Sequence, residues 1–332
     1  MPTTTSINLN ALATNLGNYC QDFNSQIFSQ ALIGLEKLKE GNGITILESI
    51  TDEMPLLNFS VGNMIQPYDN KSFNNVANTL GFNSRTLKAR RYKVDLLIHP
   101  EDFRNQWLAH NRPTRGMMKE ITDMPYHEFI MMKLMEKVGL ELFWAAWGGV
   151  YSAPVIGTPN PAATWVDVLD GFIKLLQVEV AANAVPVVAT GALTSSNIVA
   201  KLEAVGNELG GTTTDGTGVM FVSRKAYRMY AQSDNTVGRF IGFRELDGPI
   251  TLRGTGIKVI ECPALDKAGK PNAVIATTMN NMFMGTDVLD SRNKIEIQKF
   301  ERSIKVLIDG TWGSQIALVD KVNNPIIVND QL

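Results

Sequence analysis

The strongest pattern in the chain is a helical one between residues 123 and 148, DMPYHEFIMMKLMEKVGLELFWAAWG. Apolar side chains fall on nearly every side of an ideal helix drawn through this segment, which is typical of a helix that is buried on several sides. Asp123 is suited to the N-cap position, Pro125 to the first turn, and Gly148 with Gly149 to the end of the helix. At about 1.5 Å of rise per residue, the segment forms a rod of about 37 Å around which other elements can pack.

A strand pattern precedes this helix. Residues 85–98 alternate between polar and apolar positions, with Leu87, Ala89 and Val94 among polar neighbours. Residues 71–93 contain six basic side chains and no acidic one. A long, polar and positively charged strand has little apolar surface to bury by itself. We therefore expect this segment to project from the body or to lie on another molecule.

The rest of the chain mixes helices with short strands and contains no internal repeat. Thr164 opens a capping-box-like sequence, TWVD, with Asp in place of the usual Glu, and the hydroxyl residues 194–196 are suited to cap a further helix. The pattern predicts helices over residues 25–38, 164–180 and 198–209, and strands within residues 185–190, 218–222, 250–263 and 273–286, with two or three more between residues 293 and 328.

Residues 218–235, GVMFVSRKAYRMYAQSDN, allow two interpretations. A strand that runs into Ser223 and then into Arg224, Lys225 and Arg228 can frame a phosphate or nucleophile site, or it can be a plain joint between a strand and a helix. In the second case Ser223 is the N-cap. The helix dipole disfavours cations in the first turn, so these three need an anionic partner or open water. A phosphate would serve, but a carboxylate on an adjacent subunit is sufficient, and we favour the joint.

Composition narrows the class of protein. The chain has 332 residues, of which 44% are hydrophobic and 19% are charged, which fits a folded protein with an extensive neutral surface. The net charge of −2 argues against a dedicated nucleic-acid coat or a polybasic membrane binder. Cys20 and Cys262 fit neither a redox pair nor a metal site, and the sequence contains no secretion signal and no membrane-spanning stretch. We expect a protein that stays in a reducing, cytosol-like setting.

Known catalytic patterns do not occur in the sequence. No glycine-rich segment completes a P-loop or a dinucleotide-binding motif, and there is no G-x-S-x-G nucleophile elbow. His99, His110 and His127 have no zinc-ligand spacing. We therefore predict a structural protein that is not an enzyme and needs no cofactor or metal, with no catalytic, cofactor-binding or metal-ligating residue.

The order of these elements resembles the major capsid protein of tailed bacteriophages, which has the Hong Kong 97-type fold. The resemblance is carried by the extended basic segment before the long apolar helix, by the run LTSSNIVAKLEAVGNEL followed by GVMFVSRKAYRMY, and by IKVIECPAL followed by AVIATTMNNMFMGTD. It implies an α+β fold with an N-terminal arm over residues 1–60, an extended β-hairpin, the E-loop, over residues 61–115, a peripheral domain with the spine helix over residues 116–163, an axial domain over residues 164–290, and returning peripheral strands over residues 291–332.

The same resemblance implies a function. Copies of the chain would assemble into hexamers and pentamers of an icosahedral shell that encloses phage double-stranded DNA, which it contacts non-specifically. A separate scaffolding protein and a portal would be partners, and the location would be the virion capsid, assembled in the host cytoplasm without a membrane. The basic side chains are then candidate contacts between subunits: Lys71, Arg85, Lys88, Arg90, Arg91, Lys93, Arg224, Lys225 and Arg228. We do not expect the Lys–Asn crosslink of some family members, although Asn323 and Asn324 occur in the tail.

Two alternatives remain open at this stage. One is the shell protein of an encapsulin-like nanocompartment, which is also structural. The other is an α/β nucleotide-binding module or enzyme that uses the corner formed by Ser223, Arg224 and Lys225. Loss of turnover or nucleotide affinity after mutation of this corner would support the second alternative.

Overall fold

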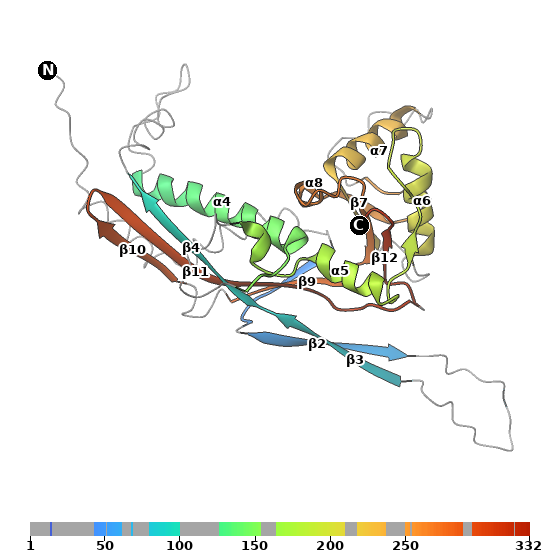
Figure 1. Cartoon of the computed structure of the whole chain (residues 1–332). Coiled ribbons are helices and arrows are strands. Elements are labelled where there is room, and N and C mark those ends of the chain that lie inside the picture. Colours follow the sequence, from blue (N-terminus) through green and yellow to red (C-terminus); the bar gives the residue numbers. More distant parts are fainter. Residues whose placement is uncertain are drawn as a thin grey trace.

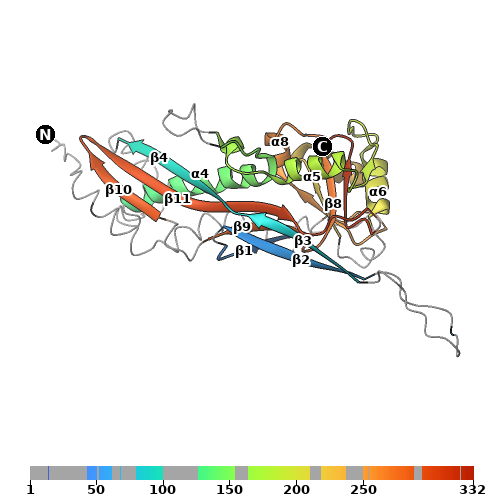
Figure 2. The same cartoon turned by 60° about the horizontal axis from the view of Figure 1, so that its bottom comes forward.

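The structure is a computed structural model, which describes residues 14, 43–50, 52–61, 68, 80–99, 126–153, 164–209, 218–236, 250–252, 254–287, 294–321 and 323–332. These described residues form two five-stranded sheets and one two-stranded sheet. Figures 1 and 2 show an elongated body that carries the first sheet and a long helix, a rounder part that contains the second sheet, and a thin hairpin that leaves the body below the second sheet. Within the described residues, no helix is both long and apolar enough to span a membrane.

The first sheet is organised around one long strand. β11 (Ser303–Ile316) pairs with β10 (Lys294–Phe300), β4 (Arg90–Ile98) and β9 (Met282–Thr286), and β9 pairs in turn with β1 (Ile44–Leu47). Along β4 the burial alternates from residue to residue, because one face of the sheet is covered and the other is exposed. The long helix α4 (Tyr126–Gly148) lies along the covered face (Figure 1).

The second sheet has helices on both faces. Its strand order is β5 (Val187–Val188), β12 (Ile326–Asn329), β8 (Val274–Thr278), β6 (Gly218–Val222) and β7 (Lys258–Glu261). Its helices are α5 (Phe172–Ala181), α6 (Ile198–Glu208), α7 (Arg224–Thr236) and the short α8 (Pro263–Lys267).

The central strand β6 is buried along its whole length. Val219 and Phe221 enter one hydrophobic core, whereas Met220 and Val222 enter another on the opposite face. Alternate residues of a strand point to opposite faces, so a strand buried on both faces must be apolar throughout. This explains the unbroken apolar run in the sequence.

One of these cores joins the two sheets. It contains residues of α4 and α5 together with Trp312 of the first sheet and Phe221 of the second. At its centre Trp147 packs edge to face against Phe172 and Phe221, with ring centroids 5.3 and 5.0 Å apart. The C-terminal end of α4 therefore ties the elongated body to the second sheet.

The third sheet is the hairpin of β2 (Glu53–Val61) and β3 (Leu80–Lys88), which pair antiparallel over their whole length. It extends away from the body in both views (Figures 1 and 2). A two-stranded ribbon is marginally stable by itself in water. The contacts between the base of the hairpin and the body therefore determine the direction in which the hairpin extends.

The predicted long helix is confirmed, and it ends at Gly148 as expected. Its predicted cap, Asp123, and Pro125 lie outside the described residues, as does the helix expected over residues 25–38. The single strand expected over residues 85–98 is wrong. It is two strands, β3 and β4, separated at Ala89, whose N–H donates to the carbonyl of Asp52 at 2.8 Å. β4 pairs with β11 of the same chain, so it does not project.

The helix expected over residues 164–180 is also interrupted. Trp165–Asp167 forms one turn of 3-10 helix, and α5 begins only at Phe172. The Thr164 hydroxyl donates to the Asp167 carboxylate at 2.5 Å rather than capping the backbone. Gly171 is the N-cap of α5 and allows the chain to pass close to α4, since a Cβ at this position would lie 2.6 Å from the carbonyl oxygen of Trp147.

The remaining expectations are met in part. Strands occur at β5, β6, β7, β8 and β9, and three more follow in the tail. α6 begins at Ile198 as expected, but Asn197 is its N-cap and makes no side-chain capping bond. Of the tail strands, β10 and β11 lie in the first sheet whereas β12 lies in the second. The boundary proposed at residue 60 between the N-terminal arm and the E-loop falls inside β2. A periodic pattern reports that a segment is a strand, but not which partner it takes.

Candidate functional site

The base of the β2–β3 hairpin is fixed to the first sheet by an apolar contact. Leu87 is completely buried and packs with Ile50 and Leu56. It lies directly over Gly285 of β9, where a Cβ would come within 2.6 Å of the Leu87 side chain. Gly313 of β11 likewise leaves room for the backbone of β3, because a Cβ there would lie 2.4 Å from the carbonyl oxygen of Lys88. Two glycines thus allow the hairpin to cross closely over the sheet.

Polar contacts complete this base. The guanidinium of Arg85 forms an ion pair with Glu179 of α5 at 2.5 Å, and the side chain of Gln315 donates to the carbonyl of Thr86 at 2.8 Å. Farther along the hairpin, Leu57 is 82% exposed. The hairpin therefore carries an apolar side chain in open water just beyond its anchored base.

The structure places most of the predicted contact residues beside groups of the same chain. Arg85 pairs with Glu179, Lys88 with Glu53 at 2.9 Å, and Lys93 with Asp95 at 2.6 Å, while Arg90 lies over the ring of Tyr151 at 4.2 Å. The hydrogen bond that Lys93 donates to the Asp95 carboxylate raises the pKa of Lys93. Arg91 is exposed, and no carboxylate pairs with it in the described part of the chain. Lys71 lies outside the described residues.

Ser223 joins β6 to α7 with both of its hydrogen-bonding functions used. Its hydroxyl accepts from the N–H of Ala226 at 3.1 Å and donates to the carbonyl of Pro271 at 2.6 Å. The side chain is completely buried. The predicted N-cap role of Ser223 is thereby confirmed, and the hydroxyl is held away from nucleophilic chemistry.

The first turn of α7 is neutralised by carboxylates of the same chain. The N–H of Arg224 donates to Asp266 at 3.0 Å, and its guanidinium donates to Glu261 at 2.5 Å. The hydrogen bond to Glu261 raises the pKa of Arg224. Asp266 thus occupies the place at the helix N-terminus where a phosphate would bind. We interpret the corner as a joint.

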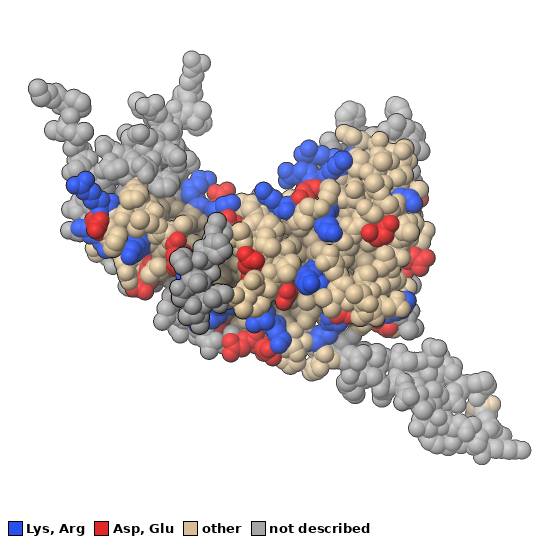
Figure 3. Space-filling model, in the orientation of Figure 1, with Lys and Arg blue, Asp and Glu red and all other residues tan. Residues whose placement is uncertain are grey.

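Lys225 and Arg228 remain exposed beside this joint, and among the described residues no carboxylate pairs with either. Figure 3 shows Lys and Arg gathered on the edge of the second-sheet part where α7 and α8 begin, whereas opposite charges are interspersed over much of the rest of that face. These two side chains, with Arg91, are the predicted contact residues that are free to meet another molecule.

Replacing Ser223 by alanine is expected to lower the free energy of unfolding by about 1–3 kcal/mol, because the N-cap bond is lost and the N–H of buried Ala226 loses its acceptor. Urea denaturation followed by circular dichroism measures the change. Ser195→Ala is the control, since Ser195 is exposed and its side chain makes no hydrogen bond within the described part of the chain. Its expected effect is within about 0.5 kcal/mol. Equal stability of Ser223→Ala and wild type would contradict the cap.

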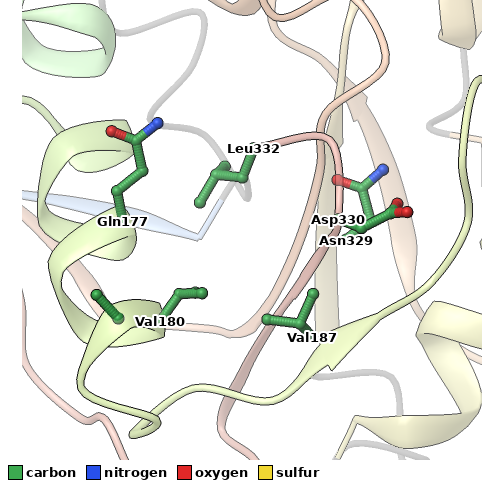
Figure 4. A pocket seen from close by; sticks show the side chains of 7 residues that line it. Gln177, Val180, Val187, Asn329, Asp330 and Leu332 are labelled. Carbon is green, nitrogen blue, oxygen red and sulfur yellow. The ribbon is translucent and has the colours of Figure 1, made fainter.

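A shallow cleft of about 370 Å³ lies between α5, β5 and the last residues of the chain (Figure 4). The polar groups of Asn329 and Asp330 are already engaged within the chain. The Asn329 side chain bonds Thr190, Asn272 and Val274, and the Asp330 carboxylate accepts from the Thr190 hydroxyl and from the N–H groups of Thr190 and Gly191. We therefore assign the cleft no ligand. No group of three potential metal ligands occurs among the described residues.

Acid is expected to weaken the Asp330 contact. Partial loss of hydration opposes the charged form of Asp330, but the hydrogen bonds from Thr190 and Gly191 outweigh it and lower its pKa. A lowered folded-state pKa stabilises the fold above the unfolded value of about 3.9, and this stabilisation is lost as the pH falls through the folded-state pKa. Because the carboxylate is exposed, the effect is below about 1 kcal/mol.

Urea denaturation between pH 7 and pH 2.5 tests this expectation. Asp330→Asn should flatten the acid limb of the stability curve relative to wild type. Glu208→Gln, which changes an exposed carboxylate on α6 that makes no side-chain hydrogen bond within the described residues, should leave the limb unchanged. Identical curves for wild type and Asp330→Asn would show that the contact does not stabilise the fold.

Sequence reasoning did not find the partners Glu179, Glu261 and Asp266. Asp266 lies on α8, which was not predicted, Glu261 is the last residue of β7, and Glu179 lies on α5. A signal for Asp266 existed, because Cys262–Pro263 followed by an acidic residue is a plausible helix start. Glu179 had no such signal, since its partner is 94 positions away.

Solved structures of phage particles resemble this chain over most of its length. A chain in the procapsid of satellite phage P4, a structure that includes the size determination (Sid) protein, matches 90% of this chain and 90% of its own length, with 11% identity and a TM-score of 0.58. A chain in the capsid of Myoviridae phage XM1 matches 88% of this chain and 90% of its own, with 9% identity and a TM-score of 0.50. No family model and no curated protein matches the sequence. At these identities the likeness establishes the fold, which is the Hong Kong 97-type fold expected from the sequence.

Proposed function

We propose that this chain, which has the fold of phage capsid chains, is a major capsid protein whose copies form the hexamers and pentamers of an icosahedral shell around phage double-stranded DNA. The observation that carries the proposal is the likeness to the P4 procapsid chain over 90% of both chains. The shell would be assembled in the host cytoplasm with a scaffolding protein and a portal, and would contact the DNA non-specifically. The chain would act as a structural protein and not as an enzyme.

The hairpin supports this role on physical grounds. A two-stranded ribbon that leaves the body gains stability when a neighbouring molecule covers it. Leu57, 82% exposed on β2, contributes apolar surface that such a neighbour would bury. Subunits of a closed shell make heterologous contacts, in which one patch meets a different patch on the next copy. An extended hairpin is suited to that kind of contact.

The basic residues contribute unequally to the proposed contacts. Arg85, Lys88, Lys93 and Arg224 already have acidic partners within the chain. Arg91, Lys225 and Arg228 are exposed and are the better candidates for ion pairs with a neighbouring subunit. An exposed pair stabilises by about 0–1 kcal/mol, but a shell repeats it many times.

Electron microscopy of the expressed chain, alone and with a co-expressed scaffolding protein, tests the proposal. Closed shells of uniform size are the expected result. Shells that enclose a cargo enzyme in the native host would favour a nanocompartment. Persistent monomers under all assembly conditions would overturn the proposal.

A further inference from the structure

Among the ion pairs of the described residues, only the pair of Arg85 and Glu179 connects the projecting hairpin to another part of the molecule. It joins the base of the projecting hairpin to α5, a helix of the second-sheet part. We propose that this pair sets the direction in which the hairpin leaves the subunit, and so acts as a positioning contact for the hairpin. The consequence for assembly rests on the proposed function, whereas the positioning itself does not.

The environment of the pair favours a firm contact. The side chains of Arg85 and Glu179 are 24% and 18% exposed, whereas those of the neighbouring pair Lys88 and Glu53 are 57% and 56% exposed. Charge-assisted bonds that are partly withdrawn from water are stronger and less screened than exposed ones. Arg85 and Glu179 should therefore hold a fixed geometry, whereas Lys88 and Glu53 should contribute little.

The other contacts at the base fix the direction of the hairpin less firmly than this ion pair does. Leu87 packs into an apolar site over Gly285, and burial of apolar surface is non-directional, so it anchors the hairpin without preventing a small rotation. The hydrogen bond from Gln315 reaches Thr86, which is adjacent to the buried Leu87. A contact so close to Leu87 hardly restricts rotation of the hairpin about that residue. Arg85 lies one residue farther out and reaches a separate structural element. It therefore acts as a second, lateral support.

The support on the other side is rigid. α5 buries Phe172, Ile173 and Leu176 in the core that joins the two sheets, so its outer residue Glu179 is held in place. A strand advances about 3.4 Å per residue, which puts the far end of β3 about 17 Å beyond Arg85. A rotation of only about 10° at the base thus moves that end by about 3 Å, which is roughly the donor–acceptor distance of a hydrogen bond. A small error at the base would misplace every contact farther out.

The proposal is tested by measuring the distance between two spin labels in the unassembled subunit. One label is attached at the far end of β2 in Val61→Cys, and the other on exposed Ala200 of α6 in Ala200→Cys. Cys20 is replaced by serine, and Cys262 is buried. In Glu179→Ala the mean distance should shift by about 3 Å or the distribution should broaden by that amount. Arg85→Ala should give the same result.

Matched variants separate positioning from general loss of structure. The charge-swapped double variant Arg85→Glu with Glu179→Arg should restore the narrow distribution, and Lys88→Ala, which breaks the exposed pair within the hairpin, should leave it unchanged. Thermal midpoints of all variants report whether the body remains folded. An unchanged distribution in folded Glu179→Ala would overturn the proposal, as would failure of the charge swap to restore it. Because the subunit is not assembled, a chain that shows the shift but never forms shells would contradict the proposed function alone.

Discussion

Replacing Trp147 by alanine is expected to lower the free energy of unfolding by about 3–5 kcal/mol. Trp147 is completely buried and packs edge to face against Phe172 of α5 and Phe221 of β6. Its indole N–H has no hydrogen-bond partner among the described residues, so the loss comes from packing and from the cavity left behind. Domains are stable by only about 5–15 kcal/mol, so the variant should unfold at a much lower urea concentration and should no longer assemble.

Trp144, one turn earlier on the same helix, provides the control. It is partly exposed and lies near the ammonium groups of Lys137 and Lys267, at 4.9 and 5.1 Å from the ring centre. Cation–π contacts at exposed sites contribute about 0.5–1 kcal/mol, so Trp144→Ala should cost far less than Trp147→Ala. Urea denaturation of both variants, followed by tryptophan fluorescence and circular dichroism, measures the difference. Equal losses would mean that the core is not centred on Trp147.

Shortening the hairpin is expected to abolish shell formation without unfolding the subunit. Leu57 and Ser84 lie opposite each other in the register of β2 and β3, so an Asn-Gly turn can join them in place of residues 58–83. The shortened chain keeps Leu56, Arg85 and Leu87, and with them the anchored base. Its thermal midpoint should stay within about 4 °C of wild type.

Electron microscopy and sedimentation of the shortened chain measure the effect on assembly. Under conditions where the full-length chain forms shells, the shortened chain should remain as free subunits or small oligomers. The full-length variant Lys88→Ala is the control and should assemble normally, because it alters only an exposed pair within the hairpin. Normal closed shells from the shortened chain would show that the hairpin is not an assembly contact.

The candidate site was visible in the sequence only as a set of charges. The basic composition of residues 71–93 drew attention to the hairpin and to β4, but it implied that the whole segment projects or finds its partners on another molecule. In the structure Arg85, Lys88 and Lys93 have partners of three kinds: a distant helix, the adjacent strand and a neighbour on the same strand face. A charge pattern alone does not distinguish among these, because each needs only one carboxylate within about 4 Å.

The sequence by itself determined the features that depend on neighbours a few positions away. The all-round apolar pattern of α4, the continuous apolar run of β6 and the N-cap at Ser223 follow from helical and strand periods and from capping geometry. Only the tertiary structure decided that residues 85–98 divide between two sheets, that β12 joins the second sheet, and that Arg85 reaches Glu179. Strand pairing and ion pairing join residues far apart in the chain, and the packing of the whole molecule selects which of many similar partners meet.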